Sequence, residues 1–255
     1  PIIASKINNF LPKKDILNYL EAILTTYNQE GRRDNIYKAR IKILVKELGI
    51  EKFKSLVEEN FAKLANKELE IDDKSMEEIF KYFKLPPLKS NTNQIPIKNN
   101  QEYQNWVKQN VIPHKVRGYS IVQISLKAPK RSPGDATSNQ MTALAEVSEI
   151  FSFSEIRVTH EQNLILPHVP NKELFNLWKK LKKEKVATPN LGLITDTICC
   201  PGMDYCALAT ARSIPISQKI SSHFKNYLKQ KEIGNLKIKI SGCINACGHH
   251  HVGNI

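Results

Sequence analysis

Five cysteines are the residues best suited to chemistry in this chain of 255 residues, and all of them lie between positions 199 and 247. Five residues separate Cys200 from Cys206, and three separate Cys243 from Cys247. Thiolates from two such loops can surround an iron–sulfur cluster, whose irons are held by cysteine sulfur. The loops also contain small and turn-forming residues that permit close backbone approach; these are Pro201, Gly202, Gly242, Ala246 and Gly248. The spacing favours an iron–sulfur cluster.

Three other interpretations of the cysteines stay open at this point. Structural zinc prefers roughly two to four residues between paired cysteines, so the five-residue gap fits it poorly. Disulfides and unrelated buried thiols are the other two. No charged-then-apolar leader opens the chain, which argues for a cytoplasmic protein with metal-binding cysteines rather than disulfides. Cys199 is left over, and we interpret it as a packing residue because Cys200 completes the spacing.

Composition limits the classes of partner. Lysine and arginine total 38 against 25 aspartates and glutamates, a net charge of +13 that favours anionic partners. Most lysines are scattered along the chain, as expected for solvated helix faces. Basic residues do not form a patch interleaved with aromatics, so nucleic acid is not expected as a partner. The apolar stretches are only a few residues long, which predicts no membrane span.

Helices dominate the expected structure before residue 70. Periodic apolar residues predict helices over 15–30, 37–48 and 51–64. In the first of these, Asp15 is a plausible N-cap. The residues that make one apolar stripe on this helix are Ile16, Leu17, Leu20, Ile23 and Leu24. Loop chemistry around Pro86-Pro87 and Pro96 predicts a linker from about 70 to 110.

An α+β unit follows and should position the cysteines. We predict, in order, a strand over 119–126, a helix from 137 or 138 to 151, strands over 155–159 and 163–166, and a helix over 171–185. The order β-α-β-β-α is most of a ferredoxin-like fold. After about residue 189, the two cysteine pairs flank an expected helix over 217–231 and a strand over 236–240.

The cysteine loops carry a family resemblance. The stretch from Thr197 to Ala209, followed by Ser241 to Gly248, resembles the C-x5-C…C-x3-C signature of siroheme-dependent sulfite and nitrite reductases. Pro133-Gly134-Asp135 and the stretch from Ile156 to Leu164 resemble the second ferredoxin-like half-domain of that family. Tyr27 to Lys42 resembles the end of its first cluster-type domain.

The resemblance implies an α+β fold in a fragment of a longer enzyme. The implied organisation is the C-terminal part of a first siroheme domain over 1–70, a linker over 71–110, and a ferredoxin-like half-domain over 111–187. Residues 188–255 would then be the truncated start of a second siroheme/[4Fe–4S] domain. Most of the basic residues that bind substrate are expected in the missing N-terminal half, so the catalytic residues are unknown.

The resemblance also implies two cofactors, a siroheme and a [4Fe–4S] cluster. The cluster ligands would be Cys200, Cys206, Cys243 and Cys247, and Cys247 would be shared with the siroheme iron. Siroheme carries carboxylates that basic and amide side chains can bind. The implied contacts are Arg33, Arg40, Gln162, Asn163 and Asn245. A solvated helix face is the alternative for the arginines, and turn formation is the alternative for Gln162 and Asn163.

The implied activity is the six-electron reduction of sulfite to sulfide, with ferredoxin or a flavoprotein as electron donor. Sulfite is preferred because the run His249 to His251 resembles bacterial sulfite reductase hemoproteins. The alternative within the family is reduction of nitrite to ammonia. Two hypotheses from other classes are a zinc-stabilised module that binds nucleic acid and an electron carrier that holds only a cluster.

Overall fold

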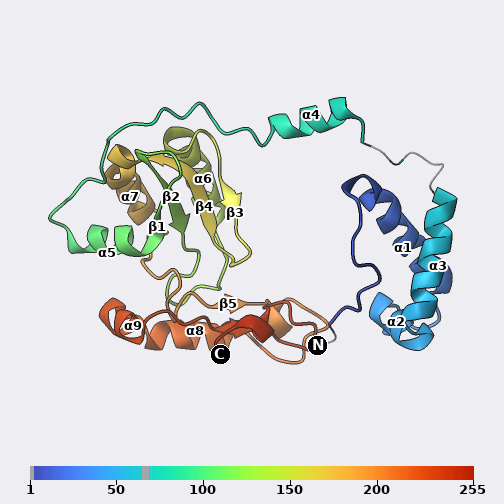
Figure 1. Ribbon diagram of the computed structural model, residues 1–255. Coiled ribbons are helices and arrows are strands. Elements are labelled where there is room, and N and C mark those ends of the chain that lie inside the picture. Colours follow the sequence, from blue (N-terminus) through green and yellow to red (C-terminus); the bar gives the residue numbers. More distant parts are fainter. Residues whose placement is uncertain (1–2, 65–68, 70) are drawn as a thin grey trace. The chain divides into compact units, whose positions relative to one another are not determined.

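The computed structural model describes residues 3–64, 69 and 71–255 (Figure 1). The chain divides into two compact units, residues 1–84 and 85–255, and each is described by itself. No helix in the described ranges is both long enough and apolar enough to cross a membrane.

The first unit is helical. It contains α1 (Ile16–Glu30), α2 (Ile41–Leu48), α3 (Ile50–Leu64) and α4 (Asp73–Lys81). The turn of Lys13–Asp15 precedes α1, and the backbone N–H of Gly31 closes it on the carbonyl of Tyr27. A small core joins the first three helices; its buried residues are Tyr19, Ala22, Leu44, Phe53 and Val57.

The apolar stripe predicted on α1 meets the core of this unit only in part, because Ile23 alone of its five residues packs against that core. Leu20 is 49 % exposed and Leu24 is 59 % exposed, whereas Tyr19 and Thr26 are buried. The polar side chains of the buried face form hydrogen bonds with α3. Tyr19 Oη donates to Glu58 over 2.8 Å, and Asn60 Nδ2 donates to the Thr26 hydroxyl over 2.9 Å. Burial of polar groups costs little once they are hydrogen-bonded, so a mixed face can displace the apolar stripe.

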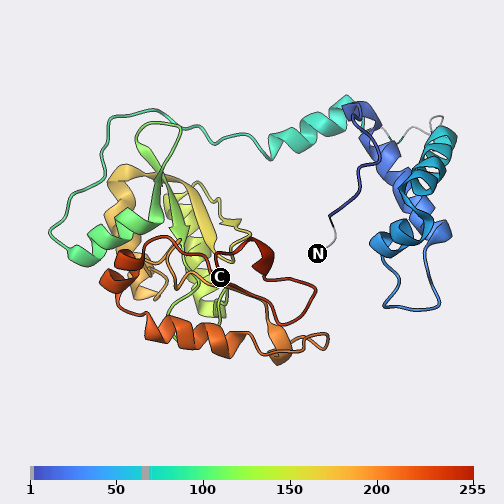
Figure 2. The same cartoon turned by 60° about the horizontal axis from the view of Figure 1, so that its bottom comes forward.

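The second unit contains a four-stranded antiparallel sheet in the order β1-β2-β4-β3 (Figures 1 and 2). The strands are β1 (Val111–Pro113), β2 (Tyr119–Ile124), β3 (Arg157–Val158) and β4 (Leu164–Pro170). The helices α6 (Ser138–Phe151) and α7 (Leu174–Lys183) pack against it. Thr137 and Gln140 form a capping box at the start of α6. The predicted β-α-β-β-α order is confirmed.

The segment 71–110, expected to be a linker, contains helices in the structure. It contains α4 and also α5 (Gln101–Asn110), whose Tyr103 and Trp106 are 1 % and 0 % exposed in the core of the second unit. Burying an aromatic side chain stabilises a fold by roughly 1.5–3 kcal/mol, so two of them hold α5 firmly. The side chain of Asn100 caps the helix by accepting from Tyr103 N over 3.0 Å.

The last segment adds a two-stranded parallel sheet, β5 (Ile198–Cys199) and β6 (Lys239–Ile240), with α8 (Ile214–His223) and α9 (Tyr227–Ile233). The single helix predicted over 217–231 is therefore two helices. The helical structure is interrupted after His223, and a new helix begins after Asn226. The Asn226 side chain caps α9 by accepting from Leu228 N and Lys229 N. This segment belongs to the same compact unit as the ferredoxin-like part, so the expected boundary at 188 separates no independent body.

Candidate iron–sulfur site

The parallel pairing of β5 with β6 brings the two cysteine loops together. Cys199 lies opposite Ile240, and Cys200 N donates to Ile240 O over 3.0 Å. Cys200 directly follows β5, and Cys243 comes three residues after the end of β6. Because parallel strands end at the same edge of a sheet, residues that are 43 positions apart in the sequence emerge side by side.

Two glycines let the loops touch. A Cβ on Gly242 would lie 2.7 Å from Ala211 O and 2.9 Å from the Cα of Gly202. The carbonyl of Gly242 also accepts from Thr210 N over 2.9 Å and from Ala211 N over 3.0 Å. A side chain on Gly242 would push the loops apart, so glycine here is required by close backbone approach.

Cys200 has the surroundings of a thiolate ligand. Its side chain is buried, its Sγ accepts the backbone N–H of Gly242 over 3.0 Å, and the Ser213 hydroxyl lies 3.5 Å away. Burial acts to raise the pKa of this thiol, but hydrogen bonds from Ser213, Gly242 and Gly202 together bring the pKa below its ordinary value. Backbone N–H groups aimed at sulfur stabilise a thiolate and tune any iron bound to it.

Cys199 has the opposite surroundings. Burial raises the pKa of its thiol to about 12, with smaller contributions from Cys200 and Asp204. Its Sγ faces the carbonyl of Cys200 over 3.3 Å. A thiol that stays protonated is a poor metal ligand, which supports a packing role for Cys199.

The other three cysteines face outward to different degrees. Cys206 and Cys243 are half-buried, and Cys247 is exposed. In the described residues, no group of three or more cysteine, histidine, aspartate or glutamate side chains converges closely enough to hold a single metal ion. A four-iron cluster binds each thiolate at a different iron, so its ligands need not meet at one point. The four-thiol donor set, the amide aimed at Cys200 and the glycine contact fit such a cluster.

Replacing Gly242 by alanine tests the contact between the loops. We expect the variant to lose about 1–3 kcal/mol of stability from overpacking and to retain less iron. Ala207→Ser, an exposed change directly after Cys206, should affect neither quantity. Thermal unfolding together with iron and acid-labile sulfide assays measures both. Wild-type iron content in the alanine variant would contradict the role given to this contact.

Gln162 lies against the backbone of the first cysteine loop. Its Nε2 donates to Cys199 O over 2.8 Å, and its Oε1 accepts from Cys199 N over 2.9 Å. A hollow of about 610 Å³ lies beside it, also lined by Gly134, Tyr205 and Ile214. Asn163 is buried, and its Nδ2 donates to Asp196 over 3.0 Å. The siroheme contacts expected of Gln162 and Asn163 stay predictions, and these hydrogen bonds give both residues a structural task.

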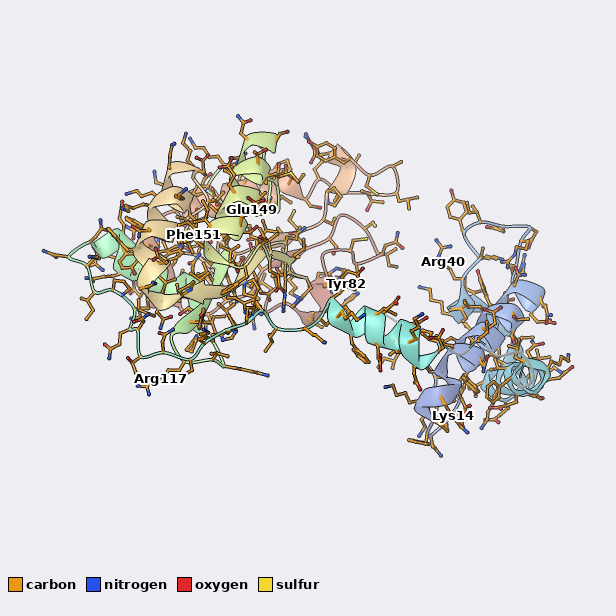
Figure 3. The ribbon with its side chains drawn as sticks, turned by 90° about the horizontal axis from the view of Figure 1, so that it is seen from above. Lys14, Arg40, Tyr82, Arg117, Glu149 and Phe151 are labelled. Carbon is orange, nitrogen blue, oxygen red and sulfur yellow. The ribbon has the colours of Figure 1, made fainter. Side chains whose placement is uncertain are left out.

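Three other expected siroheme contacts are exposed. Arg33 stacks 5.1 Å from the ring centroid of Tyr27 and donates to the side chain of Asn28 over 3.0 Å. Arg40 lies directly before α2 and donates to Ala39 O over 2.9 Å (Figure 3). Asn245 is exposed between Cys243 and Cys247. The arginines belong to the first unit and Asn245 to the second, so their roles at one cofactor stay predictions.

Sequence reasoning missed a buried ion pair beside the site. Lys127 Nζ lies 2.6 Å from Asp196 Oδ1, and their side chains are 2 % and 5 % exposed. Lys127 Nζ also donates to Glu161 O over 2.5 Å, and Asp196 Oδ2 accepts from Gly192 N over 2.8 Å. Lys127 directly follows the stretch predicted as a strand, and Asp196 lies 69 residues later. Nothing in the sequence near either residue indicates that the two form a pair.

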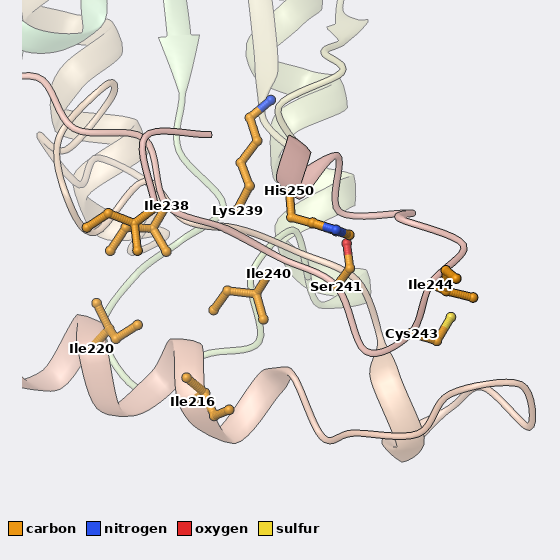
Figure 4. A pocket seen from close by; sticks show the side chains of 10 residues that line it. Ile216, Ile220, Ile238, Lys239, Ile240, Ser241, Cys243, Ile244 and His250 are labelled. Atoms are coloured by element: carbon orange, nitrogen blue, oxygen red, sulfur yellow. The ribbon is translucent and has the colours of Figure 1, made fainter. Parts of the chain in front are cut away.

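An apolar hollow of about 510 Å³ lies between α8 and β6 (Figure 4). Ile216 and Ile220 of α8 line one side, Ile238 and Ile240 line the other, and Cys243 stands at one end. His250 also borders it, so the histidine run lies close to the second cysteine loop.

Comparisons with known proteins agree with this fold. Residues 2–64 match the family described as "Nitrite and sulphite reductase 4Fe-4S domain", and residues 112–184 match "Nitrite/Sulfite reductase ferredoxin-like half domain". The structure of the Mycobacterium tuberculosis NirA protein matches with a TM-score of 0.64 and 21% identity, over 97% of this chain and 40% of that one. At this identity, the solved structure supports the fold alone.

Curated relatives match along nearly the whole chain. The chloroplastic ferredoxin–nitrite reductase of Spinacia oleracea is 23% identical over 99% of this chain and 37% of its own length. The ferredoxin–nitrite reductase of Synechococcus elongatus is 25% identical, over 99% and 43%. Sulfite reductase [ferredoxin] 1 of Mycolicibacterium paratuberculosis is 22% identical, over 100% and 40%. The chain thus spans about two fifths of the length of these relatives.

The two matched domains, in this order and on this α+β fold, define an oxidoreductase class. The chain belongs to the nitrite and sulfite reductase family. Members of this family use a siroheme and a 4Fe–4S cluster.

Proposed function

We propose that the complete protein is a ferredoxin-dependent nitrite reductase that reduces nitrite to ammonia. The observation that carries the proposal is the pair of cysteine loops that β5 and β6 hold together, within a chain that matches ferredoxin–nitrite reductases over 99% of its length. The comparisons favour nitrite, our alternative, over sulfite, our main expectation from the sequence. Cysteines that bind a cluster as thiolates would fit a reducing compartment such as the cytoplasm.

Different residues of this chain would bind the cluster and the siroheme. Cys200, Cys206, Cys243 and Cys247 would hold the cluster, and Cys247 would also reach the siroheme iron. Arg33 and Arg40 supply fixed positive charge suited to the carboxylates of siroheme. The Ser213 hydroxyl and the Gly242 amide favour the thiolate form of Cys200 that an iron requires. When bound, the cluster would pass on electrons from the ferredoxin donor, and the siroheme would supply the iron centre for reduction of the anion.

Sulfite is the second candidate substrate. Sulfite reductase [NADPH] subunit beta of Saccharomyces cerevisiae is 22% identical over 96% of this chain, close to the identity of the nitrite reductases. A cluster-only electron carrier and a zinc-stabilised nucleic-acid module are disfavoured by the family assignment.

Assays of the full-length protein separate these functions. With reduced ferredoxin as donor, we expect ammonium from nitrite at a kcat/KM well above that for sulfide from sulfite. A visible spectrum should show a chlorin-type band together with iron–sulfur absorption. A higher kcat/KM for sulfite would establish the second candidate instead, and a colourless zinc protein would overturn the proposal.

A further inference from the structure

Several hydrogen bonds stabilise the turn between β3 and β4. Thr159 Oγ1 accepts from Glu161 N over 3.3 Å and from Asn163 N over 3.1 Å, and Thr159 N donates to Asn163 O over 2.9 Å. Inside this turn, Gln162 adopts a left-handed backbone conformation with φ of 58°. That conformation is unfavourable for a residue with a side chain, so the contacts made by Gln162 must hold it there.

The side chain of Gln162 forms hydrogen bonds with the edge of β5 that does not pair with β6. In β5, the N–H of Ile198 donates to Ile238 O and the N–H of Cys200 donates to Ile240 O, each over 3.0 Å. The backbone groups of Cys199, between them, point to the other side of the strand, where the side-chain amide of Gln162 meets both. An amide donates and accepts at once, so Gln162 replaces a neighbouring strand at this position.

The same turn also reaches the chain that enters β6. Glu161 Oε1 lies 2.6 Å from Lys237 Nζ, and Lys237 comes two residues before β6 begins. Glu161 O accepts from Lys127, whose partner Asp196 lies two residues before β5. One turn of the ferredoxin-like part therefore contacts the approach to both cysteine loops.

We propose that Gln162 is a positioning residue for the cluster: by holding both backbone groups of Cys199, it sets where Cys200 Sγ stands against the Gly242 N–H. The inference rests on the proposed function, which places a cluster on Cys200. The hydrogen bond from Gly242 to Cys200 spans the two loops over 3.0 Å, so it depends on the register of β5 against β6. Hydrogen bonds to cluster sulfurs set reduction potential, so Gln162 acts on the potential through Cys199.

The test uses the full-length protein with its cofactors and compares Gln162→Leu, Gln162→Glu and Gln140→Leu. Leucine can neither donate nor accept, whereas glutamate can still accept from Cys199 N but cannot donate to Cys199 O. Gln140 is the matched control, because its amide also bonds a backbone carbonyl, Glu184 O, over 2.7 Å, but it caps α6 rather than the cysteine loop.

We expect Gln162→Leu to change the cluster's reduction potential and its electron paramagnetic resonance signal, and to speed hydrogen exchange of the Cys199 amide about tenfold, as loss of one hydrogen bond would. In exchange of the Cys199 amide, Gln162→Glu should fall between leucine and wild type, because it still accepts from Cys199 N. It provides the measurement if the leucine variant does not fold. Gln140→Leu should lower the melting temperature without moving the potential. A wild-type potential in both Gln162 variants, or an equal shift in Gln140→Leu, would overturn the positioning role. Lack of a cluster in the wild-type protein would instead overturn the proposed function.

Discussion

The Cys247→Ser variant of the full-length protein is expected to lose both its iron–sulfur absorption and its reductase activity. Serine oxygen is a harder ligand than thiolate and cannot replace the sulfur that would join the cluster to the siroheme iron. Cys247 is exposed, so the serine side chain itself should disturb little packing, and any lost stability will come from the lost cluster. The loss should exceed the roughly 10–100-fold that changes outside the ligand set cause. Iron content, the visible spectrum and nitrite turnover measure the effect.

Cys199→Ala provides the control. Cys199 adjoins a proposed ligand, but its thiol pKa, raised to about 12, keeps it protonated. We expect this variant to retain iron, sulfide and the siroheme spectrum, with only the modest destabilisation of a small buried change. Retention of both centres in Cys247→Ser, or loss of both in Cys199→Ala, would contradict the division of roles among the cysteines.

Breaking the ion pair between Lys127 and Asp196 should have the largest effect on stability. We expect Asp196→Ala to reduce the free energy of unfolding by about 3–5 kcal/mol, because removing one partner leaves a buried ammonium without compensation. The change also removes the acceptor of Asn163 Nδ2 and of Gly192 N. Chemical denaturation of the variant and the parent at neutral pH measures the difference. Lys182→Met, which breaks the exposed pair with Glu102, should cost no more than about 1 kcal/mol.

The pH dependence of Asp196→Ala gives a second measurement. Burial lowers the pKa of Lys127, and Asp196 opposes this change. Without Asp196 the pKa in the folded state falls further, so above it the unfolded chain binds more protons and stability rises with pH. The stability deficit should therefore shrink as the pH rises toward the unfolded lysine value of about 10.4. A deficit that does not change with pH would show that the lost hydrogen bonds, rather than the charge on Lys127, determine the cost.

The ferredoxin-like order of elements was predictable because its signals are local. Alternating residues mark β2, and Thr137 with Gln140 marks the start of α6. Register and burial were less predictable. The apolar stripe of α1 is largely exposed because Tyr19 and Thr26 find polar partners on α3, and α5 lies where loop residues predicted a linker. Both depend on contacts with residues distant in the sequence.

The sequence by itself determined the chemistry available to this protein, because four thiols at fixed spacings and two loop glycines are properties of residue identity. The tertiary structure decided how the pKa values of the thiols differ. Burial keeps Cys199 protonated, whereas the Gly242 amide, delivered by the pairing of β5 with β6, favours the Cys200 thiolate. It also decided that Gln162 holds Cys199 from 37 residues away. Hydrogen bonds and desolvation act through space, so no local pattern could have predicted them.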